Sequence, residues 1–266
     1  MRKLLCVVLF IAMNISSCSK KHAVVTPLKP DPFIATIKKI ASSVVPVVCA
    51  DAKPNRPWTL VSIEGTAFFV SQSGAFVTAN HVINGITSVQ RTKPCPISAV
   101  YVPKNGWGYE VNEFSIEYIR FVPNGCLTED AADLAVCFPI GNFKQMIGND
   151  AVPITLEQTL QPEGTPVAFS GFPLDFTQPL TSRGNIAAYA NVREPGEPFD
   201  MVIDKGAWPG ASGSPVYLVN GRVVGMILAR GTGAGQGISF ARTSSYLVRF
   251  LAGTLKAGEK QQPNSK

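Results

Sequence analysis

The 266-residue sequence predicts an all-β protein made of two packed β-barrels, with a short helix near each end. Its 23 glycines and 21 prolines supply many turns, which a fold of short strands needs and long helices do not. Strand-like runs recur in two stretches of similar length, residues 33–150 and 151–255, which we take as the two barrels. Hydrophobic residues make up 45% of the chain and charged residues 16%, enough apolar content for packed cores.

Residues 1–17 are predicted to be a signal peptide of the lipoprotein type. Arg2 and Lys3 precede the apolar run Leu4–Met13, which is too short to span a bilayer as a stable helix. The following Ile15-Ser16-Ser17-Cys18 resembles a bacterial lipobox, in which the cysteine becomes the lipidated first residue; an ordinary secretory signal is the alternative. We therefore expect export from the cytoplasm to the cell envelope and a membrane anchor at Cys18.

Residues 18–32 are predicted to be a linker. Pro27, Pro30 and Pro32 stiffen and extend such a spacer. His22 lies in this solvated stretch, so it is interpreted as a bystander rather than a catalytic residue.

The first barrel is expected to begin with a short helix. Asp31 can cap it, and Phe33, Ile34, Ile37 and Ile40 fall on one face. The strands expected next are Val44–Ala50, Leu60–Ile63, Gly65–Val70, Phe76–Thr78, Thr87–Arg91, Ile97–Val102, Tyr118–Val122 and Leu134–Phe138.

The second barrel is expected to end in a helix that begins at Thr243 and runs to Leu255, followed by a disordered tail at residues 256–266. Asn220-Gly221 is a favourable hairpin turn. The strands expected here are Pro166–Ser170, Ile186–Ala190, Met201–Ile203, Pro215–Leu218, Arg222–Ala229 and Gly237–Ala241.

The formal net charge is +6, a mild excess carried by scattered basic residues. A nucleic-acid-binding protein would gather such residues on one face or along one helix. The composition therefore gives no reason to expect nucleic acid as a partner.

One stretch has the pattern of a nucleophile on a tight turn. Ser212 lies between Gly210 and Gly213 and is followed by Ser214-Pro215. The glycines allow the amide N–H groups of Gly210 and Ser212 to point into one small space, where a negative oxygen could be stabilised. The alternative is a plain Gly/Ser turn between two strands.

Two further residues could assist such a serine. His81 follows a strand, at its junction with a loop, where an imidazole can face a cleft. Asp133 opens the apolar run Leu134–Val136, where an acid is costly to bury unless a partner such as an imidazole N–H is present. Asp133 could instead merely cap the strand, and Asp130 is the nearest competitor for its role.

His81, Asp133 and Ser212, in that order, resemble the catalytic triad of trypsin/chymotrypsin-like serine proteases, and the surrounding motifs are most similar to the HtrA (Deg) branch. The resemblance covers roughly residues 33–252. The motifs that carry it are Gly65–Val70, Thr78–Val82, Asp133–Val136, Gly171–Pro173, Gly184–Ile186, Pro209–Pro215, Gly225–Ala229 and Gly237–Ala241.

This resemblance implies two six-stranded, chymotrypsin-like barrels and a serine endopeptidase that acts on proteins or peptides without a metal or organic cofactor. His81 would be the general base, Asp133 would orient it, and Ser212 would be the nucleophile. The amides of Gly210 and Ser212 would form the oxyanion hole. A catalytically silent relative, a lipoprotein that uses the same fold for binding or scaffolding, is the alternative.

Departures from the family pattern refine these expectations. Ala211 replaces the aspartate with which many relatives capture a newly cut N-terminus, so no activation by cleavage is expected. Gly206 stands where trypsin-like enzymes place an acid, and with Ala207 and Ala229 nearby it predicts a small or medium apolar substrate residue rather than a basic one. Ser214 replaces the usual glycine, a change we expect to be tolerated. HtrA-type chains usually continue into a PDZ domain, and none is expected after Leu255.

Four cysteines remain after the signal peptide and the lipid site: Cys49, Cys95, Cys126 and Cys137. Export permits disulfides, but the sequence leaves all three pairings open. A bond between Cys126 and Cys137 would brace the loop that carries Asp133. No cysteine lies in the Gly210–Gly213 turn, which excludes a cysteine nucleophile there.

Overall fold

A computed structural model of the chain describes residues 30–54, 56–104, 106–107, 115–149, 151–190 and 200–261. The chain divides into two compact units, Met1–Asp31 and Pro32–Lys266, and the described helices and strands all lie in the second. The predicted signal peptide, most of the predicted linker and Cys18 lie outside the described residues. Within the described part of the chain, no helix combines the length and apolarity that a membrane crossing requires.

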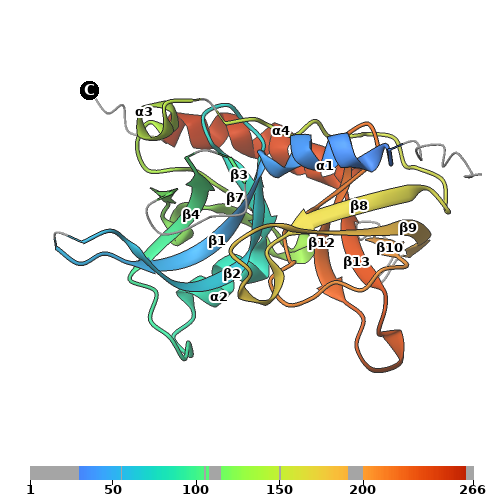
Figure 1. The fold of residues 1–266 in the computed structure, drawn as a ribbon, viewed down its shortest axis with the longest axis horizontal. Coiled ribbons are helices and arrows are strands. Elements are labelled where there is room, and N and C mark those ends of the chain that lie inside the picture. The colour runs from blue at the N-terminus through green and yellow to red at the C-terminus, as the bar shows by residue number, and fades with distance from the viewer. Residues whose placement is uncertain are drawn as a thin grey trace, which may run out of the picture. The chain divides into compact units, whose positions relative to one another are not determined.

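The second unit is mostly β, as predicted, and its first part is a seven-stranded antiparallel sheet, which we call the N-terminal sheet (Figure 1). The strand order is β5-β4-β1-β2-β3-β7-β6. Its strands are β1 Val44–Asp51, β2 Thr59–Phe69, β3 Phe76–Ala79, β4 Ile97–Pro103, β5 Ile116–Arg120, β6 Leu127–Glu129 and β7 Leu134–Cys137.

The N-terminal sheet curls so that segments following β5 and β7 meet. Phe121 forms an isolated antiparallel bridge with Pro139, and the Ile140 N–H donates to the Arg120 carbonyl at 2.8 Å. Strand β6 pairs with β7 outside this junction, which gives one strand more than the six expected. The chymotrypsin-like double-barrel class is nevertheless confirmed.

The second part is a closed six-stranded barrel, the C-terminal barrel, with strand order β10-β13-β12-β11-β8-β9. Its strands are β8 Pro166–Gly171, β9 Leu180–Ala190, β10 Asp200–Ile203, β11 Pro215–Tyr217, β12 Val223–Arg230 and β13 Ser239–Thr243. The predicted hairpin turn joins β11 to β12. Gly221 there has φ +82° and donates its N–H to the Leu218 carbonyl at 2.9 Å.

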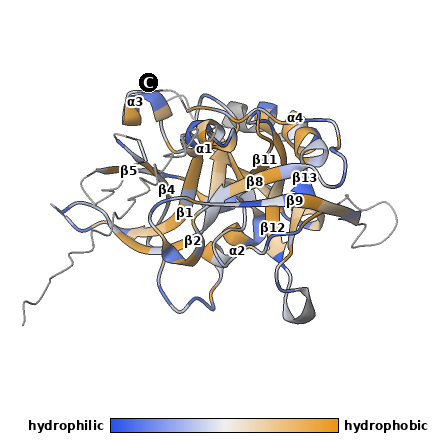
Figure 2. Cartoon of the chain, turned by 45° about the vertical axis from the view of Figure 1, so that its right-hand side comes forward, coloured by the Kyte–Doolittle hydropathy of each residue, from blue (hydrophilic) through white to orange (hydrophobic). Residues whose placement is uncertain are grey.

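Helices α1 (Phe33–Ala41) and α4 (Ser244–Gln261) run along the same side of the second unit, across the sheet and the barrel (Figure 1). Phe33 of α1 and Leu247 of α4 belong to one buried cluster that also contains strand residues from both parts. A smaller apolar cluster fills the C-terminal barrel, around Ile186 and Met201. Most of the buried apolar residues lie in the strands, several of which are coloured as hydrophobic in Figure 2, so burial of their inner faces stabilises this arrangement.

Several predicted elements differ from the observed ones. The predicted strand Thr87–Arg91 is wrong: Thr87 ends helix α2 (Asn80–Thr87), which buries Val82, Ile83 and Ile86 at helical spacing, and residues 88–91 form no strand. Tertiary packing of that face overrides the β-preference of its branched side chains. The prediction also missed β6 and the short helix α3 (Phe143–Ile147).

The two terminal helices also depart from expectation. Helix α1 begins after Pro32, and it buries Thr36 while leaving Ile34 half exposed. Helix α4 continues to Gln261, so the predicted disordered tail is wrong for residues 256–261. Residues 262–266 lie outside the described residues.

Two disulfides decide among the three possible cysteine pairings. Cys49 of β1 is bonded to Cys95, just before β4, and Cys126 is bonded to Cys137 at the end of β7. The second bond closes the segment that contains Asp130 and Asp133. Cross-links of this kind typically stabilise a fold by about 2–4 kcal/mol, chiefly by restricting the unfolded chain.

A buried arginine links the C-terminal barrel to the N-terminal sheet. Arg242 of β13 is only 1% exposed, forms an ion pair with Asp200 at 2.8 Å, and donates from Nε to the Ala132 carbonyl at 3.2 Å. Ala132 directly precedes Asp133, so this side chain of the barrel supports the loop that carries the predicted catalytic acid.

We predict that Arg242→Met destabilises the protein by about 3–5 kcal/mol, because it leaves the Asp200 carboxylate buried without its cation. Urea unfolding followed by tryptophan fluorescence measures the change. The control is Arg249→Met on the exposed side of α4, which removes a cation–π contact with Tyr246 but, within the described part of the chain, no ion pair. Equal stability of the two variants would contradict the prediction.

Candidate active site

The strand register brings His81 and Asp133 together. In the antiparallel pair β3–β7, Ala79 lies opposite Leu134, so the end of β3 meets the start of β7. The ladder continues one step further, as the Asn80 N–H donates to the Asp133 carbonyl at 3.1 Å. His81 follows in the first turn of α2 and is thereby placed beside Asp133.

Asp133 holds His81 at two points. One carboxylate oxygen accepts the backbone N–H of His81 at 2.8 Å, and the other lies 2.7 Å from the ring Nδ1. A carboxylate at Nδ1 favours the tautomer with the proton on that nitrogen, which leaves Nε2 as a base. The His81 side chain is 48% exposed and that of Asp133 only 21%, so the imidazole is accessible while its partner is shielded.

The backbone of Asp133 adopts a left-handed conformation with φ +55°, uncommon for a residue other than glycine. Such strain is found where the surrounding structure fixes a functional side chain. Asp130 has a different contact, since its Oδ1 accepts the side-chain amide of Asn80 at 2.6 Å. Of the two acids that could orient His81, Asp133 therefore contacts it, whereas Asp130 accepts a hydrogen bond from Asn80, the first residue of α2.

Ser212 lies on a tight turn that only glycines can complete. Gly210 and Gly213 have φ values of +90° and +89°. A Cβ on Gly213 would approach the Thr66 carbonyl oxygen to 1.9 Å, and one on Gly210 would approach the Phe172 carbonyl oxygen to 2.5 Å. The Ser212 hydroxyl donates to the Leu228 carbonyl at 3.2 Å.

Along this turn, backbone N–H groups that donate a hydrogen bond within the protein alternate with N–H groups that do not. The N–H of Ala211 donates to the Trp208 carbonyl at 3.0 Å, and that of Gly213 donates to the Ile227 carbonyl at 2.8 Å. Among the described residues, neither the Gly210 N–H nor the Ser212 N–H has a hydrogen-bond partner. These are the two donors predicted to receive an oxyanion.

Thr66 of β2 joins the Ser212 turn to the N-terminal sheet. Its N–H donates to the Ser212 carbonyl at 2.8 Å, and its hydroxyl donates to the Gly210 carbonyl at 2.9 Å. The Thr66 carbonyl in turn accepts the hydroxyl of Thr78 on β3, the strand that leads into His81, at 2.7 Å. Sequence reasoning quoted the Gly65–Val70 motif but assigned Thr66 no role.

Gly65 brings the Ser212 turn close to the helix that carries His81. A Cβ on Gly65 would lie 2.7 Å from the Val82 side chain and 3.2 Å from the Ser212 carbonyl oxygen. Both groups therefore pack directly against this glycine, and Val82 is the neighbour of His81 in α2. The fold thus gathers His81, Asp133 and Ser212 at the junction of the sheet and the barrel.

A family model described as the trypsin-like peptidase domain matches residues 65–226, more than half of the chain. The matched range contains the histidine, the aspartate and the serine just described. The chain belongs to this family. A comparison with curated proteins finds no match.

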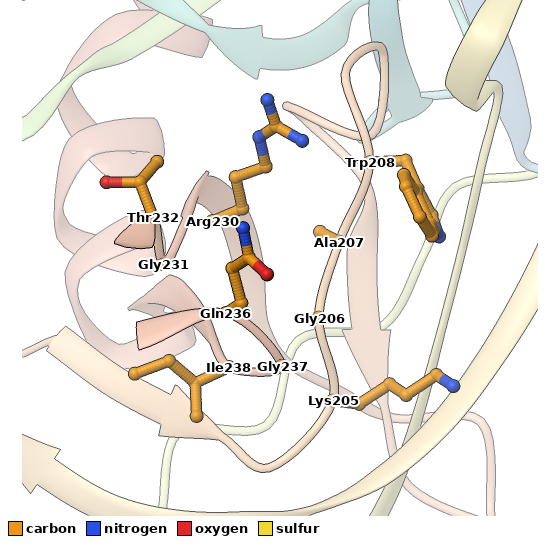
Figure 3. Close-up of a pocket in the computed structure, with 10 residues that line it drawn as sticks. All are labelled: Lys205, Gly206, Ala207, Trp208, Arg230, Gly231, Thr232, Gln236, Gly237 and Ile238. Atoms are coloured by element: carbon orange, nitrogen blue, oxygen red, sulfur yellow. The ribbon is translucent and has the colours of Figure 1, made fainter. Parts of the chain in front are cut away.

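The trypsin-like domain has a cavity of about 450 Å³ beside the Ser212 turn (Figure 3). Predicted residues Gly206 and Ala207 line it, whereas Ala229 does not and is exposed. Neighbouring side chains of a strand point to opposite faces, so the cavity receives Arg230 in place of Ala229. The full lining is Lys205, Gly206, Ala207, Trp208, Arg230, Gly231, Thr232, Gln236, Gly237 and Ile238.

Ser214 is fully buried in the trypsin-like domain. Its N–H donates to the Ala211 carbonyl at 3.0 Å, and its carbonyl accepts the Ile227 N–H at 2.9 Å. Its Oγ has no hydrogen-bond partner among the described residues. This Oγ packs closely against Gly171: a Cβ added to Gly171 would lie 1.9 Å from it.

The described residues contain no metal-binding cluster, that is, no group of three or more histidine, cysteine, aspartate or glutamate side chains that could hold a metal ion.

A second ion pair fixes the far end of the helix that carries His81. The guanidinium of Arg91 makes two hydrogen bonds to the Glu64 carboxylate, at 2.7 and 2.9 Å, and a third to the Gly85 carbonyl of α2 at 2.9 Å. Arg91 is the main cause that lowers the pKa of Glu64, while partial burial opposes it. Because Glu64 precedes Gly65, this pair ties α2 to the strand that contacts Ser212.

We predict that Glu64→Gln lowers the free energy of unfolding by about 2 kcal/mol at neutral pH, since it removes a charge-assisted, bidentate contact. The pKa of Glu64 is lower in the folded protein than its ordinary value of 4.5. The ionised carboxylate therefore stabilises the folded protein above pH 4.5, and this contribution is lost as the pH falls through the folded pKa. The difference in the free energy of unfolding between wild type and variant should therefore disappear at acidic pH. Chemical unfolding at several pH values measures it.

Glu117→Gln is the matched control, because the Glu117–Lys104 pair is longer, at 3.6 Å, and more exposed. Surface pairs of this kind contribute about 0–1 kcal/mol. The role given to the Glu64–Arg91 pair would be contradicted if the loss of stability in Glu64→Gln did not change with pH, or if it were no larger than the loss in Glu117→Gln.

Proposed function

We propose that the protein is a serine endopeptidase that cleaves proteins or peptides through a His81–Asp133–Ser212 triad and an acyl-enzyme. The observation that carries the proposal is the two-point contact of Asp133 with His81, through the ring Nδ1 and the backbone N–H. A structural histidine needs neither contact. Together they fix both the tautomer and the orientation of the ring.

In the proposed reaction, His81 Nε2 takes the proton of the Ser212 hydroxyl as Oγ attacks the carbonyl carbon of the substrate. The carbonyl oxygen becomes an oxyanion, which the N–H groups of Gly210 and Ser212 stabilise; each such donor is worth about 3 kcal/mol. His81 then gives the proton to the departing amine as the C–N bond breaks. Water, deprotonated by the same imidazole, hydrolyses the acyl-enzyme and restores Ser212.

The contact of the Ser212 hydroxyl with the Leu228 carbonyl is the observation that favours the other candidate, a catalytically silent protein of the same fold. For attack, the hydroxyl must leave this carbonyl and turn toward His81. A probe that reacts with activated serines separates the two candidates.

We predict that a fluorophosphonate probe labels the wild-type protein and that Ser212→Ala abolishes the label. Casein cleavage should be lost together with it. Asp133→Asn should lower kcat by about 10⁴, the cost of the equivalent change in the protease template, because the amide cannot hold the same tautomer.

Asp130→Asn is the matched control, since Asp130 contacts Asn80 rather than His81. It should retain most of the activity. Absence of both labelling and casein cleavage in the wild-type protein would support the silent candidate instead.

The proposal extends to the place where the enzyme acts. The motifs around the three residues support an HtrA-like enzyme, and the lipobox-like Ile15–Cys18 supports an exported lipoprotein of the cell envelope. A lipid chain on Cys18 would hold the protein at a membrane, since each buried CH₂ contributes about 0.8 kcal/mol.

We predict that the full-length chain fractionates with membranes and that Cys18→Ala moves it to the soluble fraction. Labelling with a radioactive fatty acid should disappear in the same variant. Cys6→Ala, a change within the predicted signal peptide, is the control and should leave both properties unchanged. Unaltered fractionation of Cys18→Ala would refute the lipid anchor.

A further inference from the structure

We infer that the cavity beside Ser212 binds a carboxylate, so that the enzyme selects aspartate or glutamate as P1, the substrate residue just before the cleaved bond. This inference rests on the proposed function and names the substrate class of the same site. It replaces the expectation of an apolar P1 residue, which considered only Gly206, Ala207 and Ala229.

The cavity adjoins the nucleophile on two sides. One wall, Lys205–Trp208, leads directly into the Ser212 turn, and the Trp208 carbonyl accepts the Ala211 N–H. The other wall contains Arg230, two residues after Leu228, whose carbonyl holds the Ser212 hydroxyl. A substrate carbonyl placed over Ser212 therefore puts the side chain of its own residue into this cavity.

Two polar side chains extend into the cavity. Figure 3 shows Arg230 and Gln236 in the space that faces the Gly206–Ala207 wall, whereas Lys205 and Trp208 point away on the other side of their segment. Both inward side chains carry N–H donors, and the guanidinium has a fork of donors that matches a carboxylate. Gly206 and Gly237 add no side chains, so space remains beside these donors.

The charge of Arg230 is not neutralised within the protein. Among the described residues its side chain has no hydrogen bond or ion pair, and no acidic residue lines the cavity. Asp204, which directly precedes the facing wall in sequence but does not line the cavity, accepts hydrogen bonds from the backbone and the side-chain amide of Asn185, the latter at 2.9 Å. With Lys205 at the rim, the cavity has a positive potential that attracts a carboxylate and repels lysine or arginine.

The test compares peptides that are identical except for P1, which is glutamate, aspartate, glutamine, alanine or lysine. We expect kcat/KM for P1 glutamate or aspartate to exceed that for glutamine by about tenfold or more, the usual size of a charge-assisted hydrogen bond. The ratio of aspartate to glutamate shows which carboxylate length fits. The preference should weaken at high salt.

Variants assign this preference to Arg230. Arg230→Gln should bring the ratio of glutamate to glutamine near one, and Arg230→Glu should favour P1 lysine over glutamate. A reversed preference cannot arise from a variant that merely folds poorly. Arg56→Gln removes the same charge from the β1–β2 hairpin, away from the cavity, and should leave the ratio unchanged.

A binding measurement separates this inference from the proposed function. The Ser212→Ala variant should bind the P1 glutamate peptide about tenfold more tightly than the P1 glutamine peptide, and Arg230→Gln in that background should remove the difference. Labelling by fluorophosphonate with equal cleavage of all the peptides would overturn the inference and leave the peptidase intact. Absence of labelling and cleavage, with selective binding retained, would overturn the peptidase and leave carboxylate recognition intact.

Discussion

The site depends on the hydrogen bonds of one buried threonine. Thr66 belongs to the N-terminal sheet, yet its N–H and hydroxyl bind the carbonyls of Ser212 and Gly210 in the barrel. Its carbonyl accepts the hydroxyl of Thr78, on the strand that leads to His81. Because the turn carrying Ser212 and the strand preceding His81 are fixed to the same residue, their separation is set by a few short polar contacts rather than by packing of the two parts alone.

Strand pairing places Asp133 and His81 next to each other. The register that sets Ala79 opposite Leu134 brings the residues just beyond these positions together, although they are far apart in sequence. Arg242 and the Cys126–Cys137 disulfide then support the loop on the Asp133 side, from the barrel and from the sheet respectively. The strained φ of Asp133 is maintained because the backbone on both sides of it is held.

The three residues of the proposed triad could be predicted from the sequence, because each lies in a short local motif with glycines or an apolar strand beside it. The role of Thr66 could not be read, since its partners are far away in the chain and meet it only in the folded protein. The choice between Asp130 and Asp133 was open for a similar reason: both lie in one short segment, and only the backbone direction decides which carboxylate faces His81. Helix α2 was missed because its branched residues have strand propensity, which packing overrides.

In the proposed enzyme, substrate selection and chemistry are divided between the two parts of the fold. The base and its acid belong to the N-terminal sheet, whereas the nucleophile and the cavity belong to the barrel. Strand β12 changes register against β13 between Ile227 and Ala229, and an irregularity of this kind re-aims the side chains that follow. Arg230 lies just beyond that point and lines the cavity, to which neither His81 nor Asp133 contributes. In the proposed enzyme, a substitution at this one position therefore changes the charge of the substrate residue that the cavity accepts and leaves His81 and Asp133 as they are.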